Sequence, residues 1–303
     1  MKHRILITGS NGLLGQKIVK QLSSKNEIQF LATSKGENRN PNLAAEYFKA
    51  MDITDAESIK SVADSFKPTA IINTAAMTNV DACEKDRENC WDINVNAVQY
   101  LLDYSKTNDV HLVHLSTDFV FDGEAGPYTE TDKPNPLSYY GESKEASENL
   151  LIDSDYKNWS VVRTIIVYGK APNMSRSNIV LWAKSALEKE QDLTIVYDQV
   201  RSPTWADDLA IGCLSVAEKE AYGIFHISGK DQMSIIELVR RVANFYNLDA
   251  SKIKPIKSTA LNQAAKRPPV TGFDLTKAQT ILNYNPVSFE EGLGLLEKEL
   301  NDE

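Results

Sequence analysis

Two residues, Tyr140 and Lys144, have the types and the spacing needed to transfer a proton. They stand four positions apart in the segment YGESK, so on a helix their side chains lie on one face. An ammonium beside a phenol favours the phenolate and lowers a pKa that is ordinarily about 10. We therefore predict that Tyr140 exchanges a proton near neutral pH. Its neighbour Tyr139 lacks the four-residue spacing.

Three polar residues, Ser116, Thr117 and Asp118, follow a largely apolar, strand-like run at residues 110–115. In an open parallel sheet, ligands collect beyond the carboxyl ends of the strands. We expect the hydroxyl of Thr117 or Ser116 to bind a substrate oxygen beside Tyr140. Asp118 is interpreted equally as a substrate contact or as a turn-forming residue.

A glycine-rich turn, GSNGLLG at residues 9–15, stands between the first strand-like run and the first helical pattern. Glycines permit a tight turn and close approach of the backbone to phosphate, and a helix N-terminus offers unpaired N–H groups. The spacing is GxxGxxG, and its place between a strand and a helix is the context that a dinucleotide site requires. We predict that a pyrophosphate binds at Gly9, Asn11, Gly12, Leu13, Leu14 and Gly15.

The end of the second strand-like run bears on which cofactor binds. An acidic residue there would bind a ribose 2′-hydroxyl and select NADH. This chain has Ser34 and Lys35 instead, with Arg39 nearby. Basic groups attract a 2′-phosphate, so NADPH is slightly favoured over NADH. The alternative is that Lys35 and Arg39 are simply exposed.

Alternating elements must position these residues. Strands are expected at residues 4–7, 28–32, 47–51, 70–73, 110–115 and 160–167, and helices at 14–22, 55–66 and 80–106. Such alternation indicates an α/β fold with a Rossmann-like, doubly wound parallel sheet. We assign residues 1–168 to an NAD(P)-binding Rossmann domain.

The alternation weakens after Gly169. Helices are expected at residues 178–190, 206–220, 234–247 and 290–300, and short strands at 193–196 and 224–227. We assign residues 169–303 mainly to a smaller α/β substrate-binding part, with the chain free to cross back between the two. The segment 251–273 is basic and has no acidic residue, which indicates either a solvated loop or a rim that faces an anionic ligand.

The composition excludes several classes of protein. The 303 residues carry 33 basic and 42 acidic side chains, a net charge of −9, which is not the footprint of a nucleic-acid binder. No apolar run approaches the roughly 20 residues of a membrane span. Neither the four histidines nor the three cysteines have the spacing of metal ligands, so no metal is expected. Free thiols favour a cytoplasmic location.

The glycine turn, STDFVFDG at residues 116–123 and YGESK together resemble the extended short-chain dehydrogenase/reductases. The chain is most similar to the dTDP-4-dehydrorhamnose reductase family of nucleotide-sugar reductases. Further matching segments follow in order at residues 51–55, 73–84, 163–169, 198–199 and 203–204. The resemblance runs from the N-terminus to about residue 290.

The resemblance implies that NAD(P)H delivers a hydride to the C4 ketone of a nucleotide-diphosphate-linked deoxy sugar. Tyr140 would supply the proton, Lys144 would hold the nicotinamide ribose, and Thr117 would orient the ketone. These groups act on the two ends of one carbonyl. Further cofactor contacts implied by the family lie at Asp52, Ile53, Ala75, Ala76 and Thr78, besides Ser34 and Lys35.

Two positions depart from the family pattern. Ile166 stands where the family typically has a tryptophan that packs on the sugar, and Arg201 replaces a glycine. Arg201 and Arg267 resemble the diphosphate-binding arginines of related epimerases and dehydratases. Because two guanidinium groups suit a diphosphate, we predict that they clamp the substrate. The alternative is two surface or ion-paired arginines. The predicted substrate contacts are therefore Ser116, Asp118, Ile166, Arg201 and Arg267.

Other functions stay open. One is an epimerase or dehydratase with tightly held NAD; Asp118-Phe119 lacks the Asp-Glu pair of the dehydratases, which argues against dehydration. Another is a non-catalytic, cofactor-binding regulatory subunit, since the reductases have a relative that regulates methionine adenosyltransferase. Joint presence of Thr117, Tyr140 and Lys144 favours catalysis. The sequence leaves open the nucleotide, the sugar and the choice between a monomer and a homodimer.

Overall fold

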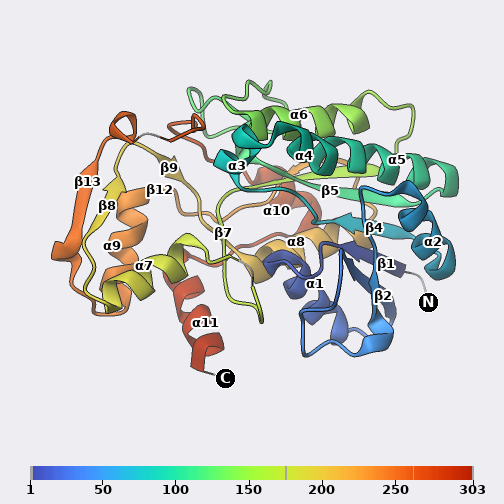
Figure 1. Cartoon of the computed structure of the whole chain (residues 1–303), viewed down its shortest axis with the longest axis horizontal. Helices are drawn as coiled ribbons and strands as arrows, with labels where there is room; N and C mark the ends of the chain where they lie inside the picture. The colour runs from blue at the N-terminus through green and yellow to red at the C-terminus, as the bar shows by residue number, and fades with distance from the viewer. Residues whose placement is uncertain (1–2, 175, 262, 302–303) are drawn as a thin grey trace.

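A parallel sheet of seven strands forms the centre of the computed structural model, which describes residues 3–174, 176–261 and 263–301 (Figure 1). The strand order is β11-β6-β5-β4-β1-β2-β3. The predicted doubly wound α/β fold is confirmed. The strands are β1 (His3–Thr8), β2 (Ile28–Ser34), β3 (Phe48–Ala50), β4 (Ala70–Asn73), β5 (His111–Thr117), β6 (Trp159–Thr164) and β11 (Gly223–His226).

Helices cover both faces of this sheet, which is why its strands are apolar along their length rather than alternating. In Figure 1, α5 and α6 lie above the sheet and α1 and α8 below it. On one face, Ile5 and Ile7 pack with α1 (Leu13–Ser23), α8 (Ala206–Glu218) and α10 (Thr276–Leu282). On the other, Leu6 and Ile71 pack with α2 (Ala56–Phe66), α5 (Ala97–Asn108) and α6 (Tyr139–Ile152).

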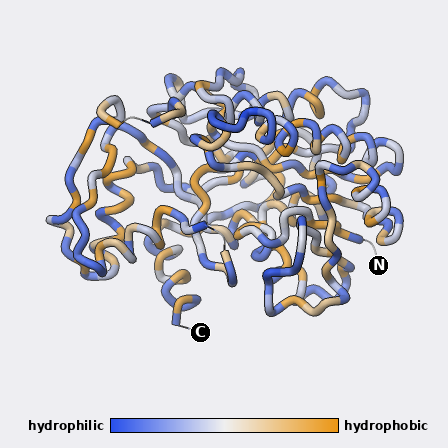
Figure 2. The backbone as a smooth tube through the Cα atoms, viewed as in Figure 1, coloured by the Kyte–Doolittle hydropathy of each residue, from blue (hydrophilic) through white to orange (hydrophobic). Residues whose placement is uncertain are grey.

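A second hydrophobic core lies beside the sheet. It is built on α7 (Ile179–Glu188), α9 (Ile235–Phe245) and α11 (Phe289–Asn301), with β8 (Leu193–Val196) parallel to β13 (Ile253–Ile256). Figure 2 shows hydrophobic stretches along the central strands and again along α9. Shorter elements complete the fold. Two small pairs are β7 (Val167–Tyr168) with β10 (Thr204–Trp205) and β9 (Val200–Arg201) with β12 (Met233–Ser234), and 3-10 turns lie at Ala45–Tyr47, Asp118–Val120, Ala250–Lys252 and Ser258–Ala260.

The chain crosses back from the second region to the sheet. Strand β11 pairs with β6, and α8 packs against α1, although both elements follow residue 168. The division at residue 168 stays a prediction. The predicted parts 1–168 and 169–303 include six residues that lie outside the described residues: 1, 2, 175, 262, 302 and 303. Of these, residue 262 also falls in the basic segment 251–273.

Two predicted elements are divided in the structure. The single helix expected at residues 80–106 is wrong: it is α3 (Val80–Lys85), α4 (Arg87–Trp91), a π-helical turn (Asp92–Asn96) and α5. Asp86 leaves helical geometry and its carboxylate caps α4 by accepting from Asn89 N–H. The strand expected at 160–167 breaks at Ile166, whose φ of 30° turns the chain away from the sheet. No helix in the described part of the chain is long and apolar enough to cross a membrane.

Candidate active site

Tyr140 and Lys144 lie on the first turns of α6, at the edge of the sheet where the parallel strands end. Ser138 caps this helix by accepting from Gly141 N–H at 3.3 Å, which fixes where the helix begins. Both side chains are buried: 8% of Tyr140 and 2% of Lys144 are exposed. Tyr140 packs against Cys83 and Cys90. All three cysteines of the chain are free and buried.

The expected direction of the tyrosine pKa is wrong. Burial raises the pKa of Tyr140 above its usual value, and a hydrogen bond with Thr117 offsets only part of this. The Lys144 ammonium lies 3.0 Å from His114 Nε2 instead, and burial lowers the pKa of Lys144 to about 8. Desolvation is the largest cause of both shifts. Tyr140 therefore keeps its proton at neutral pH, the state needed to donate one.

Thr117 and Asp118 lie beside Tyr140, at the end of β5. The Thr117 hydroxyl donates to Asp118 Oδ1 at 3.1 Å and accepts from Phe119 N–H at 3.2 Å. Asp118 is buried and also accepts a hydrogen bond from Thr271. Burial raises the pKa of Asp118, whereas the charge of Arg201 and hydrogen bonds from Thr271 and Thr117 lower it. Asp118 starts a 3-10 turn that the Thr117 hydroxyl caps. The Asp118 carboxylate itself binds Thr117, Thr271 and Arg201, so it serves local structure whether or not it also contacts a substrate.

Ser116 and Ile166 frame the same edge of the sheet. The Ser116 hydroxyl is buried and has no hydrogen-bond partner among the described residues. Ile166 is half-buried and packs against both hydrophobic cores, at the junction between them. Ile166 therefore lies where the sheet region and the second region meet, while Ser116 lies near the end of β5.

The two arginines predicted as a clamp are near each other but already have partners within the chain. The Arg201 side chain is 2% exposed and donates to Val200 O, Pro268 O and Pro269 O, with its Nε 3.3 Å from Asp118 Oδ2. Burial lowers the pKa of Arg201, and the charge of Arg267 adds to this. Arg267 pairs with Asp81 at 2.6 Å and is more accessible. The clamp stays a prediction, with Arg267 the better placed of the two.

The glycine turn has the geometry of a close backbone approach. Gly9 has φ of +66°, and a Cβ there would stand 2.7 Å from Ala75 N. A Cβ on Gly15 would stand 2.6 Å from Gly9 O. Gly12 caps α1 without a side-chain hydrogen bond, so the first turn of that helix, where Leu13 and Leu14 lie, has N–H groups free to bind an anion.

Asn11 and the end of β2 are arranged around a second loop. Asn11 donates to Glu37 O at 2.8 Å and accepts from Arg39 N–H at 2.8 Å, so it ties this loop to the glycine turn. Lys35 is exposed and pairs with Asp52 at 2.7 Å. The sequence has no carboxylate at the end of β2, but the fold brings Asp52 there from the segment after β3. Hydrogen bonds from Lys35 and Thr54 lower the pKa of Asp52 against the effect of burial.

The remaining predicted cofactor contacts also follow carboxyl ends of strands. Ser34 ends β2, half-buried, and its carbonyl accepts from Met51 N–H at 3.0 Å. Ile53 is buried just after β3, Ala75 and Ala76 are half-buried after β4, and Thr78 is exposed. The structure thus gathers the predicted cofactor residues along one edge of the sheet.

A buried polar network that the sequence did not predict lies beside Lys144. It consists of His114, which contacts the Lys144 ammonium, together with Asn73 and Ser147, which contact the His114 ring. A signal was present, because His114 interrupts a largely apolar strand, and a buried polar side chain needs a partner. The identity of that partner was not readable from spacing. In the described residues, no three His, Cys, Asp or Glu side chains gather into a potential metal site.

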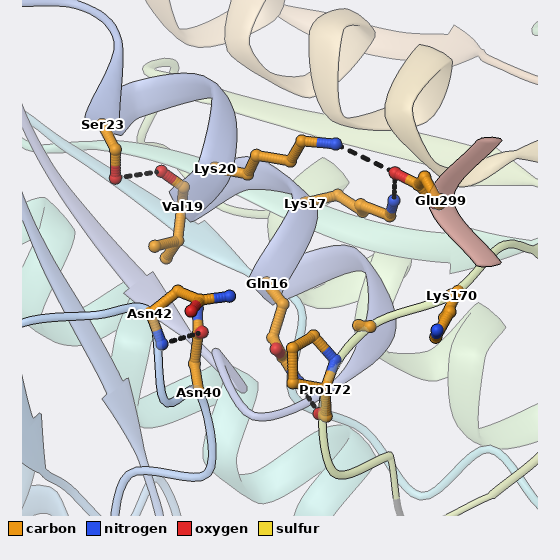
Figure 3. A pocket seen from close by; sticks show the side chains of 11 residues that line it. Gln16, Lys17, Val19, Lys20, Ser23, Asn40, Asn42, Lys170, Pro172 and Glu299 are labelled. Atoms are coloured by element: carbon orange, nitrogen blue, oxygen red, sulfur yellow. Dashed lines mark hydrogen bonds and ion pairs between the residues drawn. The ribbon is translucent and has the colours of Figure 1, made fainter. Parts of the chain in front are cut away.

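A cavity of about 340 Å³ lies away from these residues, between α1, the loop at Asn40–Asn42, the segment at residues 170–172 and α11. Figure 3 shows Lys17 and Lys20 of α1 reaching toward Glu299 of α11. Lys17 is almost fully buried and also pairs with Asp207 at 2.8 Å. These ion pairs hold α11 and α8 against α1, so the charges of Lys17 and Lys20 are already neutralised.

The chain is similar to proteins of known family over almost its whole length. A sequence model of the family described as "RmlD substrate binding domain" matches residues 2–301. The dTDP-4-dehydrorhamnose reductase of Aggregatibacter actinomycetemcomitans is 33% identical over 96% of this chain and 97% of that protein. Methionine adenosyltransferase 2 subunit beta of Danio rerio is 32% identical over 88% of this chain and 80% of that protein. Among solved structures, dTDP-4-dehydrorhamnose reductase from Bacillus anthracis in complex with NADP is 27% identical in sequence. It superposes with a TM-score of 0.80 and covers 99% of this chain and 100% of its own chain.

Proposed function

The chain belongs to the dTDP-4-dehydrorhamnose reductase family of the extended short-chain dehydrogenase/reductases, as its motifs predicted, and from that membership we propose that it reduces the C4 ketone of a nucleotide-linked deoxy sugar with NADPH or NADH. The observation that carries the proposal is the hydrogen bond between Tyr140 and Thr117 at the carboxyl edge of the sheet, with Lys144 one turn further along α6. A relative with the same fold binds NADP. These likenesses support a nucleotide-sugar reductase.

The residues of the glycine turn fit a nicotinamide dinucleotide. The positive φ of Gly9 and the absence of a side-chain cap at Gly12 leave backbone N–H groups of α1 for the pyrophosphate. The bound cofactor would supply the hydride. Lys144 would donate hydrogen bonds to the nicotinamide ribose, and the hydroxyl of Thr117 would hold the ketone oxygen against Tyr140.

Tyr140 is the proposed proton donor. Its phenol stays protonated at neutral pH because burial raises its pKa, and proton transfer to the sugar oxygen balances the charge that hydride addition creates there. The raised pKa suits reduction, in which Tyr140 begins as an acid. It suits the reverse oxidation less, in which a phenolate would have to accept a proton.

The test of the proposal is turnover of the purified protein with a panel of 4-keto nucleotide sugars. We expect NADPH absorbance to fall only when a 4-keto sugar is present, and the product to be the corresponding 4-hydroxy sugar. A constant signal with every sugar, together with firm NADPH binding, would reject the reductase. It would favour the regulatory subunit, which the similarity to methionine adenosyltransferase 2 subunit beta supports.

Arg267 is expected to contribute to substrate binding rather than to chemistry. Replacing Arg267 with alanine should raise KM for the nucleotide sugar about tenfold and leave kcat within about twofold, because a charged hydrogen bond to the diphosphate is lost. The matched control is Lys254→Ala, since Lys254 lies in the same basic stretch but pairs with Asp192 on the surface. Equal KM values for the wild type and both variants would refute this role.

Lys35 is expected to influence the choice of cofactor. Reversing its charge with Lys35→Glu should weaken NADPH binding about fivefold and leave NADH binding unchanged, since only NADPH carries a 2′-phosphate. The side chain is exposed, and among the described residues its only ion pair is with Asp52. Dissociation constants from nicotinamide fluorescence would measure this. Equal weakening of both cofactors would rule out a 2′-phosphate contact.

A further inference from the structure

Two consecutive prolines, Pro268 and Pro269, directly follow Arg267 in the basic segment 251–273. Proline has no N–H, and its ring restricts its own backbone and that of the residue before it. The pair is therefore a stiff piece of chain that presents carbonyl oxygens but no donors of its own. Buried carbonyls are stable only when they are paired, so their donors must come from another part of the fold.

The side chain of Arg201 supplies those donors. Its Nη2 donates to Pro268 O at 2.5 Å, and its Nη1 donates to Pro269 O at 3.2 Å. Its Nη1 also donates to Val200 O at 2.7 Å, and the Val200 N–H donates to Pro269 O at 2.8 Å. A planar guanidinium fork can hold neighbouring carbonyls in this way, whereas a lysine ammonium is a single point of charge. Arg201 thus fastens the proline pair to β9.

The charge of Arg201 is matched inside the fold. Its Nε lies 3.3 Å from Asp118 Oδ2, and the two side chains are 2% and 3% exposed. The Thr271 hydroxyl donates to the same carboxylate oxygen. The ring of Phe119 lies 5.8 Å from the guanidinium carbon. Arg201 is therefore enclosed, and a diphosphate could touch it only if the proline segment moved away.

Arg267 is held in a more open place. Its side chain is 18% exposed, and its Nη2 lies 2.6 Å from Asp81 Oδ2. The other oxygen of Asp81 accepts from Ala265 N–H at 3.1 Å. Arg267 can exchange this partner for a phosphate oxygen at the surface, which the enclosed guanidinium of Arg201 cannot do.

We propose that Arg201 is a positioning residue that anchors the carbonyls of Pro268 and Pro269 and so sets the place of Arg267 for the substrate diphosphate. The inference rests on the proposed function. It gives the two arginines of the predicted clamp different roles, because Arg267 contacts the diphosphate and Arg201 acts through it. The stiffness of the proline pair carries the position of the anchored carbonyls to Arg267, the next residue in the chain.

The variant Arg201→Lys tests the anchor without removing the charge. Lysine keeps a positive charge for Asp118 but cannot hold the two proline carbonyls as a fork does. We expect KM for the nucleotide sugar to rise about fivefold, because Arg267 must then be ordered when the substrate binds, at a cost of about 1 kcal/mol. We expect kcat to stay within about threefold, since Arg201 does not touch the reacting atoms.

The double variant Arg201→Lys/Arg267→Ala shows whether Arg201 acts through Arg267. If it does, the anchor has nothing left to position, and the double variant should have the same KM as Arg267→Ala alone. If Arg201 itself bound the diphosphate, the two increases in KM would multiply. A higher KM in the double variant than in Arg267→Ala, or a wild-type KM in Arg201→Lys, would overturn the proposal.

The matched control is Arg241→Lys on α9. Arg241 pairs with Glu237 at 2.8 Å and with Glu290 at 3.4 Å on the surface of the second region. We expect this variant to have the kcat and KM of the wild type. An increase in KM equal to that of Arg201→Lys would show an unspecific effect of the exchange and would also overturn the proposal.

Measurements without turnover keep this inference separate from the proposed function. If the wild type reduces no 4-keto nucleotide sugar, the proposed function fails, and dissociation constants for dTDP, UDP and GDP replace KM in the same variants. Hydrogen exchange at the amides of Val270 and Thr271 needs no nucleotide. We expect it to be faster in Arg201→Lys than in the wild type and Arg241→Lys, because the segment loses its anchor. Unchanged exchange, or a wild type that binds none of the three nucleotides, would overturn the proposal.

Discussion

Replacing Tyr140 with phenylalanine is expected to lower kcat about 10³-fold while NADPH affinity stays the same. The phenol is the proposed proton donor, and positioned proton transfer contributes roughly 10²–10⁴-fold to such reactions. The ring itself packs edge-on against Phe119, with 5.8 Å between centroids, and against Cys83 and Cys90. Phenylalanine keeps this packing, so the fold should be unaffected. Steady-state kinetics and cofactor fluorescence measure the two quantities.

The matched control is Tyr139→Phe. Tyr139 is the adjacent residue on α6, and its ring packs against Trp91 rather than toward Thr117. We expect this variant to turn over like the wild type. If Tyr140→Phe kept kcat within threefold or so of the wild type, proton donation by Tyr140 would be excluded.

Replacing Arg163 with leucine is expected to destabilise the fold by about 3–5 kcal/mol, because it leaves a carboxylate buried without its partner. Arg163 Nη2 lies 2.6 Å from Glu148 Oε2, and each side chain is 1% exposed. Since a whole domain is stable by only about 5–15 kcal/mol, the loss is large. Urea denaturation would measure it as the free energy of unfolding.

The double variant Arg163→Leu/Glu148→Leu tests the cause of that loss. Removing both charges eliminates the unpaired buried carboxylate, so we expect the double variant to recover most of the stability. Lys60→Ala serves as a control, because the Lys60–Asp64 pair is exposed and its loss should leave the unfolding curve unchanged. A double variant less stable than Arg163→Leu would show that packing, rather than charge, is what the pair provides.

Local spacing predicted much of the fold and the centre of the site. The alternation of apolar runs placed β1, β4 and β5, and the glycines before α1 placed the turn, because strand and helix periods are short-range properties. The four-residue interval likewise placed Tyr140 and Lys144 on one face of α6. These features depend on residues close together in the chain.

Long-range contacts account for what the sequence did not predict. The partner of Lys144 is His114, thirty positions earlier, and the acceptors of Arg201 are carbonyls near residue 268. The pKa of Tyr140 depends on how deeply Cys83 and Cys90 bury it, which no spacing reports. Asp52 reaches Lys35 only because β3 lies beside β2 in the sheet.

Transfer of deuterium tests the proposed reaction most directly. The wild type would be incubated with NADPH deuterated at C4 of the nicotinamide and with a dTDP-linked 4-keto-6-deoxy sugar, and the product would be examined by NMR. We expect deuterium at C4 of the sugar and nowhere else, with the Tyr140→Phe variant forming the same product far more slowly. A sugar recovered without deuterium at C4, from protein that binds NADPH, would contradict the proposed hydride transfer.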